Sequence, residues 1–539
     1  MNQVNYENNK ERNRYKSYLF LSLIIATGII VRLIITPNEI PITLDSFYYF
    51  TYSLALIEQG PFPKEYLNVN FGWPSFVSLF FVFMKDSNMM DMMLVQRIVS
   101  ISISVATIIP MFYLLKKFFR NNIAIVGVSI FCFEPHIMMN SVTGGTIPLF
   151  ILMVTCSIYF SILKKTKYVS LSFIFISLSS FIRYEGLLLL IPAIVSIFLQ
   201  EESWRNKIKS ICLAALICLI VLVPILFVGY QSDVSLCTDC SPVDILNKIP
   251  IISHLFSINT FLINVTEIDS MNYGETDPTI KKEERFATYF VNTIFSFSKI
   301  FGLLLIPTLV IFLIPAIIVI SKKITRDKII LIVYSLIIVL PSVYASSRNM
   351  DDVRYLLPLI PIIILFSSTS VRKFCLKRNE WKIGISIIVT FGIISFTFIG
   401  FQIEDYENEE EVFKSAIFIA QNAHGVNLEP GGRFMKIAEM ENNWRELPEV
   451  DERNKIFVET KRMSLKDYQN IEKFIEELKI DGLTHIVTHN ENEKEFLTEI
   501  FHNEEEFPYL SKVYDSSTLD HKKQIKIFEI DYVKFQKVS

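Results

Sequence analysis

Long apolar segments alternate with short polar connections over the first three quarters of the chain. A helix needs about 20 mainly apolar residues to cross the hydrocarbon core of a membrane. The pattern therefore predicts a mainly α, polytopic transmembrane domain of about eleven helices within residues 1–402. The predicted spans are residues 17–36, 94–115, 123–139, 145–163, 168–182, 186–199, 208–230, 300–320, 329–345, 355–371 and 382–402.

Two segments decide this count. Phe71–Met84 is short for a span and contains Gly72 and Pro74, which favours an interfacial or re-entrant helix. Residues 168–199 form either one long bent helix or two short helices that turn at residues 183–186. We prefer two short helices, because one long helix would invert the topology of everything after it. Short helices with charges at their turn indicate a water-filled cavity.

Basic clusters fix the predicted sidedness. Lysine and arginine gather on the cytoplasmic side of membrane proteins. With about eleven spans, every cluster falls in alternate connections, so we expect a multi-pass cell-membrane protein with a cytoplasmic N-terminus and an extracytoplasmic C-terminal domain. The clusters lie within residues 10–16, 116–120, 164–167, 205–209, 322–328 and 372–378.

The last part of the chain, residues 403–539, has the composition of a water-soluble protein and is long enough to form its own core. Helical and strand patterns alternate in it, which predicts an α/β domain. We expect helices at 410–423, 465–478 and 493–501, and strands at 455–459, 484–488, 512–515 and 524–530, with Gly482 ending a helix. Its role is left open between binding the acceptor, shielding the active face and a purely structural cap.

Composition excludes several classes of protein. Hydrophobic residues make up 51% of the chain, charged residues 20%, and the net charge is −3. A disordered chain, a nucleic-acid binder and a small disulfide scaffold are excluded. Cys237 and Cys240 lie in an outer connection where they can pair. His136 and His254 are isolated, so no metal site and no cofactor are expected, although a divalent cation is not excluded.

Ionisable residues lie at the outer ends of several predicted helices or just beyond them. Such side chains are usually paired or line a wet site, because hydrocarbon penalises them. Taken alone, Asp45 is a candidate N-cap of an amphipathic helix and Arg354 a candidate headgroup anchor. Together, acids and arginines on one face suit transfer from a phosphate-linked donor, in which a carboxylate takes a proton and cations hold the leaving phosphate. The residues are Arg32, Asp45, Glu134, Arg183, Glu185 and Arg354.

Four local patterns resemble the GT-C superfamily of membrane glycosyltransferases. The chain is most similar to the branch with the dolichyl-phosphate-mannose–protein mannosyltransferases and the bacterial lipid A aminoarabinose transferases. The oligosaccharyltransferase branch carries a Trp-Trp-Asp signature, whereas Trp444 stands alone here. The patterns are Arg32 followed by the loop with Asp45; Phe71-Gly-Trp-Pro74 before the helix with Arg97; Glu134-Pro135-His136 leading to Asn140 and Thr146; and Arg354-Tyr-Leu-Leu-Pro358.

The resemblance implies an extracytoplasmic active site, a polyprenyl-phosphate-linked sugar as donor, and Asp45 as the first-loop catalytic acid. We therefore expect Asp45 to act as general base on an acceptor hydroxyl, with inversion at the sugar. Arg354, Arg183 and Arg32 are the candidates for holding the donor phosphate. Glu134, Glu185 and His136 are candidates for orienting the acceptor or supporting the site, and Glu134 is equally well explained as a buried paired acid.

The predicted activity is a hexosyltransferase, with mannose as the representative sugar and a protein, lipid or glycan as acceptor. The main rival is a polytopic transporter or flippase for a lipid-linked sugar. That class favours charges at mid-membrane and internal repeats. The sequence has no evident repeat, and its charges lie at outer helix ends. A structural subunit of an envelope complex, in which Asp45 is only a helix cap, is the second rival.

Overall fold

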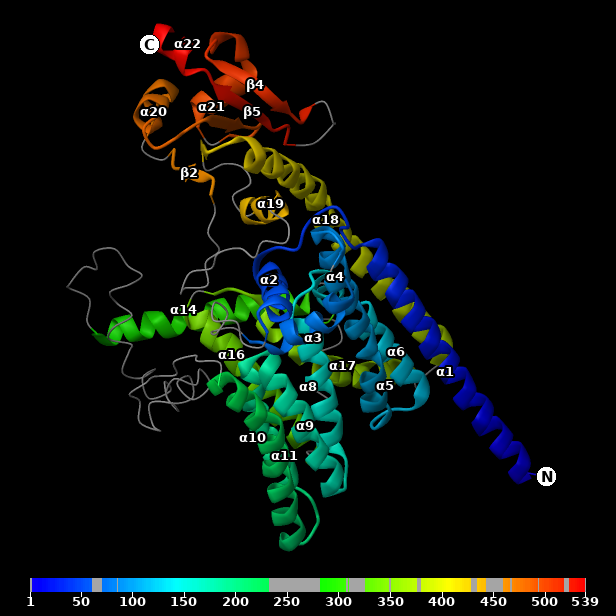
Figure 1. The fold of residues 1–539 in the computed structure, drawn as a ribbon. Helices are drawn as coiled ribbons and strands as arrows, with labels where there is room; N and C mark the ends of the chain where they lie inside the picture. Colours follow the sequence, from blue (N-terminus) through cyan, green and yellow to red (C-terminus); the bar gives the residue numbers. More distant parts are fainter. Residues whose placement is uncertain are drawn as a thin grey trace. The chain divides into compact units, whose positions relative to one another are not determined.

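The structure is a computed structural model of the full chain. It describes residues 2–60, 70–84, 86–231, 282–306, 309, 325–348, 350–375, 380–427, 434–442, 459–465, 468–492, 494–517 and 523–538. Cys237, Cys240 and His254 therefore lie outside the described residues. The described part is mainly helical, as predicted, with a small sheet near the C-terminus (Figure 1).

The helices follow the predicted apolar segments closely, with breaks at proline and at polar residues. In the first part of the chain they are α1 (Asn2–Ile34), α2 (Leu44–Glu58), α3 (Gly72–Phe81), α4 (Met89–Ala106), α5 (Ile108–Lys116), α6 (Asn121–Cys132) and α7 (Pro135–Val142). Then come α8 (Ile147–Ile162), α9 (Thr166–Ile182), η3 (Tyr184–Leu189), α10 (Leu190–Phe198), α11 (Trp204–Gln231), α14 (Lys282–Leu305), α16 (Arg326–Ser347), η6 (Val353–Leu359), α17 (Ile360–Cys375) and α18 (Glu380–Asn422).

The segment between residues 166 and 198 is a helical hairpin. Arg183 has an extended backbone (φ −151°, ψ 127°) that ends α9. The end of α10 returns to the end of α8, just before α9 begins, since Ser196 donates to the carbonyl of Ser161 and Gln200 to that of Leu163. The predicted turn at residues 183–186 is confirmed, and it brings Arg183 and Glu185 to the tip of the hairpin.

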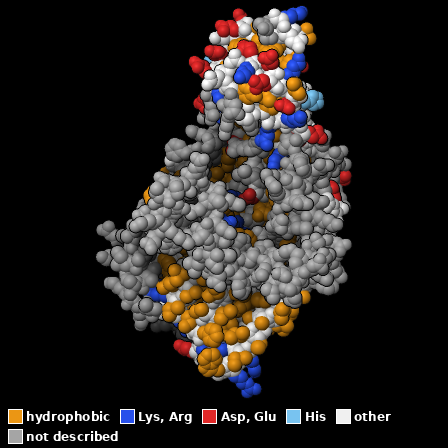
Figure 2. Space-filling view, turned by 90° about the vertical axis from the view of Figure 1, so that its left-hand side faces the viewer, with side chains coloured by type: hydrophobic (Ala, Val, Ile, Leu, Met, Phe, Trp, Pro, Cys, Tyr) orange, Lys and Arg blue, Asp and Glu red, His pale blue; other side chains and the backbone are white. Residues whose placement is uncertain are grey.

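Many described helix faces expose large apolar side chains, as a lipid environment requires. Examples are Leu23 on α1, Leu219 on α11 and Leu336 on α16, each more than half exposed. Figure 2 shows helix surfaces of this kind, with lysine and arginine at one end. Among the described residues, four helices are long and apolar enough to cross a membrane, or five if the pair α6 and α7, bent by 50°, counts as one span.

Several other predicted spans coincide with apolar helices that are too short for that criterion, including α8, α9 and the segment Tyr184–Phe198. The predicted span 300–320 and the polar segment that follows it are described only in part, because residues 310–324 lie outside the described residues. The apolar helix Gly72–Met84 is also short, in keeping with the interfacial or re-entrant helix predicted there. The helical, membrane-type architecture is thus observed, and the count of about eleven spans stays a prediction.

The C-terminal sheet is mixed, with strand order β2-β1-β3-β5-β4. β1 (Gly425–Asn427) is parallel to β2 (Lys461–Met463) and β3 (His485–Thr488), and β5 (Lys526–Ile530) pairs antiparallel with β3 and β4 (Leu510–Asp515). Helices α19 (Met435–Asn442), α20 (Ile471–Leu478), α21 (Glu495–His502) and α22 (Tyr532–Val538) accompany it. Its core contains Phe474, Leu497, Ile500 and Phe528.

This sheet confirms the predicted closing strand pair and the strand at 484–488, and Gly482 ends the α20 region with a left-handed φ of +93°. The strand predicted at 455–459 falls almost wholly outside the described residues. β1, α19 and α22 were not predicted, because segments of three to eight residues carry too little periodicity to detect.

By its internal contacts the chain forms two compact units. The first comprises residues 1–34, 69–76 and 98–398, and the second comprises residues 35–68, 77–97 and 399–539. Helix α18 continues without a break through residue 402, where the sequence places the domain boundary. Each unit carries part of the predicted chemistry.

Candidate active site

Asp45 lies in the second compact unit, in the first turn of α2, and its side chain is exposed. The N-cap of α2 is Thr43, with an extended backbone (φ −126°, ψ 171°). The alternative that Asp45 is itself the N-cap is therefore wrong. A carboxylate in a first turn is still favoured by the helix dipole, but its exposure leaves it accessible for chemistry.

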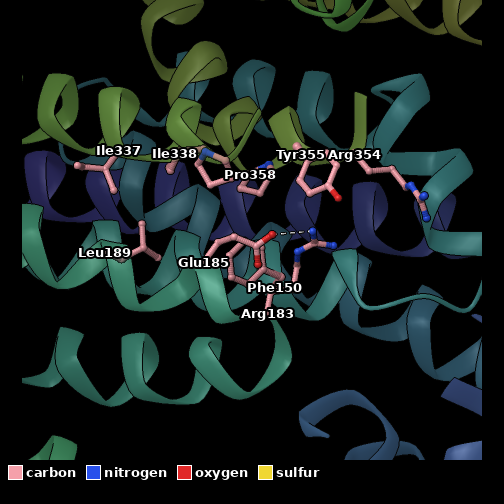
Figure 3. Close-up of a pocket in the computed structure, with 10 residues that line it drawn as sticks. Phe150, Arg183, Glu185, Leu189, Ile337, Ile338, Arg354, Tyr355 and Pro358 are labelled. Atoms are coloured by element: carbon pink, nitrogen blue, oxygen red, sulfur yellow. Dashed lines mark hydrogen bonds and ion pairs between the residues drawn. The ribbon is translucent and has the colours of Figure 1, made fainter. Parts of the chain in front are cut away.

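Arg183 and Arg354 lie in the first unit and line one pocket of about 340 Å³, a volume that includes its opening to solvent (Figure 3). The pocket is formed where the tip of the α9–α10 hairpin meets α16 and η6. Its polar lining comes from Arg183, Glu185 and Arg354, and its apolar wall includes Phe150, Leu189, Ile337, Ile338, Pro341, Tyr355 and Pro358. The two arginines that the sequence predicts to act together are thus brought to one place.

Arg183 is held on three sides. Its Nη2 donates to Glu185 Oε1 at 2.9 Å, with the two side chains 19% and 8% exposed. Its guanidinium lies 5.2 Å from the ring centre of Tyr355 and 6.0 Å from that of Phe150. Stacked on aromatic faces, an arginine keeps its charge with less hydration. This prepares a cation for an anionic ligand in a confined space.

Arg354 is paired with an acid next to it in sequence. Its Nη2 lies 2.6 Å from Asp352 Oδ2, and its Nε donates to the same oxygen at 2.7 Å. Asp352 also caps η6 by accepting from the backbone N–H of Arg354 at 2.8 Å. With 44% of its side chain exposed, Arg354 is the more accessible of the two pocket arginines.

The pocket lies at the end of the helical unit opposite three of the basic clusters. The carbonyl of Leu163 accepts from both Gln200 and Arg326, which gathers the connections at 163–166 and 198–204 and the start of α16 at one end. From there α9 runs for 17 residues, about 25 Å at 1.5 Å per residue, before it reaches Arg183. The predicted separation of basic clusters from active-face charges is therefore observed within this unit.

Arg32 does not reach this pocket in the contacts of the described residues, and it is fully buried. It donates from Nε to Ser141 Oγ at 3.1 Å, from Nη1 to the carbonyl of Gly28, and from Nη2 to that of Cys132. These contacts tie α1 to the α6–α7 break. These donors of Arg32 serve the helix junction, and its role in holding the donor phosphate stays an untested prediction.

Glu134 and His136 also act at helix ends. Glu134 is the N-cap of α7, where its Oε2 accepts from the backbone N–H of Ile137 at 2.8 Å, and it is fully buried. His136 Nε2 lies 3.1 Å from the carbonyl of Leu303 and 3.2 Å from that of Ile306, at the C-terminal end of α14. Carbonyls only accept, so this nitrogen carries the proton. Both residues support helix junctions rather than the lining of the Arg183 pocket.

Sequence reasoning missed two features of the site: the aromatic residues beside Arg183 and the acid that pairs with Arg354. The rings of Tyr355 and Phe150 face Arg183, and neither residue is assigned a role from the sequence, although arginine beside an aromatic residue is a recognisable signal. Asp352 was passed over despite its place two residues before Arg354. Within the described residues, no group of three histidine, cysteine or acidic side chains is arranged to hold a metal ion.

The fold is that of the GT-C glycosyltransferases, the superfamily that the sequence motifs resemble. The archaeal oligosaccharyltransferase AglB from Archaeoglobus fulgidus, solved with an inhibitory peptide and a dolichol-phosphate, has a TM-score of 0.51 at 10% identity over 95% of this chain and 74% of that chain. The same enzyme solved with Zn and sulfate has a TM-score of 0.52 at 11% identity, over 93% and 72%. ArnT from Cupriavidus metallidurans, bound to undecaprenyl phosphate, has a TM-score of 0.49 at 9% identity, over 94% and 97%.

At the level of the particular family, residues 77–227 match the dolichyl-phosphate-mannose-protein mannosyltransferase family. No curated protein sequence matches the chain. The matched residues run from α3 to α11 and include Arg183 and Glu185. The expected resemblance is thereby confirmed. The oligosaccharyltransferase AglB shares the fold of this chain, although this chain has the lone Trp444 in place of the Trp-Trp-Asp signature of that branch.

Proposed function

We propose that this protein is a polyprenyl-phosphate-sugar-dependent glycosyltransferase that moves a hexose such as mannose to an acceptor hydroxyl, with inversion. The observation that carries the proposal is the pocket shared by Arg183 and Arg354, at the end of the helical unit opposite the basic clusters. A phosphate diester needs paired cations in a partly dehydrated site. The family match and the shared fold support the donor class, and the mannose in the name of the matched family is the reason for proposing a hexose.

In the proposed reaction, Asp45 removes the proton from the acceptor hydroxyl while its oxygen attacks the anomeric carbon. The bond between that carbon and the phosphate oxygen breaks, and the polyprenyl phosphate leaves with the bonding electrons. Arg183 and Arg354 stabilise the charge that develops on the phosphate. Asp45 is suited to the base role by its exposed carboxylate. No step requires a resident cofactor, and a divalent cation as co-ligand of the phosphate is left open.

Glu185 is proposed as a positioning residue for Arg183, through the ion pair between them. Arg32, Glu134 and His136 are proposed to stabilise the helix junctions around the site, because their bonds run to backbone and neighbouring helices. We further propose that the N-terminus is cytoplasmic and that residues 403–539 form an extracytoplasmic domain that meets a protein, lipid or glycan acceptor. The bilayer supplies the donor.

The test uses purified full-length protein in liposomes with a radiolabelled polyprenyl-phosphate mannose or glucose and a panel of peptide, lipid and glycan acceptors. The expected result is a new glycosidic bond that depends on Asp45. Transfer of a different sugar only would refute the hexose assignment and keep the class. Movement of the donor across the bilayer without a new bond would establish a flippase instead and overturn the proposal.

A further inference from the structure

Buried residues lie on both sides of Asp45 in the chain. Ile40, Pro41 and Ile42 before it are buried, as are Ser46 and Phe47 after it. Asp45 itself is exposed. These buried residues restrain the backbone from which the Asp45 carboxylate projects, because that backbone cannot move without disturbing a packed core. The contacts that fix this backbone are therefore relevant to the position of the carboxylate.

Two adjacent polar residues of α4 make these contacts. Gln96 is fully buried, and its Nε2 donates to the carbonyl of Ser46 at 3.0 Å. Arg97 is 4% exposed, and its Nη1 donates to the carbonyls of Ile40, at 2.8 Å, and Pro37. The carbonyls thus held lie on both sides of Asp45 in the chain.

Burying an amide and a guanidinium in a membrane protein is costly unless each is well bonded, so such residues are retained where they have a use. α4 supplies a regular helix as the support, whereas the 37–43 segment has no regular structure to hold it. Arg97 also interacts electrostatically with Glu409 and Tyr406 of α18. All these groups belong to the second compact unit.

Resting on the proposed function, we propose that Gln96 and Arg97 are positioning residues that hold the backbone on both sides of Asp45 and so set the place of the catalytic carboxylate. Neither side chain is proposed to touch substrate. A displacement of about 1 Å in a reacting group can lower a rate about 10²-fold. Loss of either contact therefore lowers kcat, while the KM for the donor, set by the pocket arginines, changes little.

The principal variant is Gln96→Met, which keeps the length of the side chain and removes the donor. Its control is Ser100→Ala, one turn further along α4, which also removes a fully buried polar group whose Oγ has no hydrogen bond in the structure. We expect Gln96→Met to lower kcat at least tenfold with donor KM within about twofold, and Ser100→Ala to leave both unchanged. Equal losses in the two variants would overturn the proposal.

A double-variant cycle separates positioning from general damage. If Gln96 acts through Asp45, Asp45→Asn combined with Gln96→Met is no slower than Asp45→Asn alone, since coupled residues are not additive. A further independent loss in the double variant overturns the proposal. Arg97→Lys, which keeps the charge with fewer donors, is expected to give a smaller fall in kcat than Arg97→Met.

A measurement without substrate keeps the inference distinct from the proposed function. Hydrogen exchange of the peptide spanning residues 37–46 is expected to rise at least tenfold in Gln96→Met and to stay unchanged in Ser100→Ala. Unchanged exchange in Gln96→Met refutes the positioning role, whatever the activity. Faster exchange in a protein that transfers no sugar supports the contact and refutes the proposed function alone.

Discussion

In the second compact unit the acid Asp45 is held through its backbone, whereas in the first unit the cations Arg183 and Arg354 are held through their side chains. Asp45 has an exposed side chain on a backbone held by buried donors from α4. Arg183 and Arg354 are each tied through the side chain to a nearby acid, Glu185 or Asp352. A general base needs its basic atom accessible and fixed, which a held backbone provides. A phosphate-binding cation needs its charge stabilised before the ligand arrives, which an acid partner provides.

Because the acid and the cations are held differently, the two regions are expected to respond differently to substitution. Removal of the Asp45 carboxylate leaves every backbone contact in place, so function is lost while the fold stays. Removal of a pocket arginine leaves its partner acid without a cation. Donor binding and stability are then both expected to fall, and stability falls more when that acid is buried. Variants in the two regions therefore give different combinations of kinetic and thermal effects.

The largest effect is expected for Asp45→Asn. Positioned general-base catalysis is worth about 10²–10⁴-fold in rate, so kcat is expected to fall by that range. The melting temperature is expected to stay within about 1 °C, since exposed substitutions change stability by at most about 0.5 kcal/mol. Steady-state transfer assays and thermal unfolding of the purified protein measure the two quantities.

Asp91→Asn is the matched control for this experiment. Asp91 is also an exposed acid in the first turn of a helix of the second unit. Asp91→Asn is expected to retain wild-type kcat. Comparison of the two variants therefore separates loss of the base from any effect of removing an acid from a first helical turn. Wild-type activity in Asp45→Asn, or equal losses in the two variants, would show that Asp45 is not the base.

The next effect is expected for Arg183→Met. Loss of a charged hydrogen bond to the donor phosphate, worth about 1.5–3 kcal/mol, raises the donor KM roughly 10–150-fold. Glu185, which is 8% exposed, is left without its cation, and the free energy of unfolding is expected to fall by about 1–3 kcal/mol. Donor titrations and chemical denaturation of the purified protein test both expectations.

A double variant distinguishes these two consequences. Arg183→Met combined with Glu185→Gln removes the stranded charge, so stability is expected to recover while the raised donor KM persists. Recovery of the KM together with stability would mean that Arg183 acts only by holding the fold. In that case the pocket would not be the phosphate site.

Arg354→Met is expected to have a smaller effect than Arg183→Met. Its pair with Asp352 is 44% and 29% exposed, and exposed pairs contribute about 0–1 kcal/mol. The donor KM is expected to rise about tenfold, as one charged contact to phosphate is lost, with a change in unfolding free energy below about 1 kcal/mol. Inhibition by free polyprenyl phosphate, measured beside Asp351→Asn as a control, reports the same loss without turnover.

Sequence predicts the features that depend on local pattern. The apolar segments predict the helices, the charged turn at residues 183–186 predicts the hairpin, and the alternation of the tail predicts β3 and the β4–β5 pair. Charges at helix ends were enough to pair Arg183 with Arg354, since both follow helices that start at the basic end of the unit. These are consequences of periodicity and of the cost of charge near lipid.

Features that depend on long-range partners were not predictable. Arg32 stands at the end of an apolar helix like the other candidates, and only the positions of Ser141 and Cys132 on other helices show that it serves a junction. Gln96 and Arg97 look like polar interruptions of a span until the carbonyls of the 37–46 segment are placed beside them. In each case the deciding contact joins residues at least 50 positions apart.

The smallest effect concerns an ion pair outside both functional regions. Burial alone would raise the pKa of Glu504, but Lys526 at 2.6 Å and Lys512 at 3.0 Å outweigh it and hold that pKa below its usual value. Because the pKa of Glu504 is lower in the folded protein than the unfolded-state pKa of about 4.3, its ionised form stabilises the fold at pH values above 4.3. This stabilisation is lost as the pH falls through the folded-state pKa. The pairs are partly exposed, so Glu504→Gln is expected to cost about 0.5–1 kcal/mol at neutral pH.

This variant tests whether ion pairs matter because of where they lie. Glu504→Gln is expected to keep wild-type kcat and donor KM, and its unfolding free energy is expected to change less than that of the wild type between pH 6 and pH 3. Glu505→Gln removes the same charge in the same turn, where the described residues include no lysine ion pair, and is expected to keep the wild-type pH dependence. Glu504→Gln could also lower transfer as much as Arg183→Met does. The loss at Arg183 would then reflect ion pairing in general and not the pocket, and the contrast between structural and phosphate-binding cations would fail.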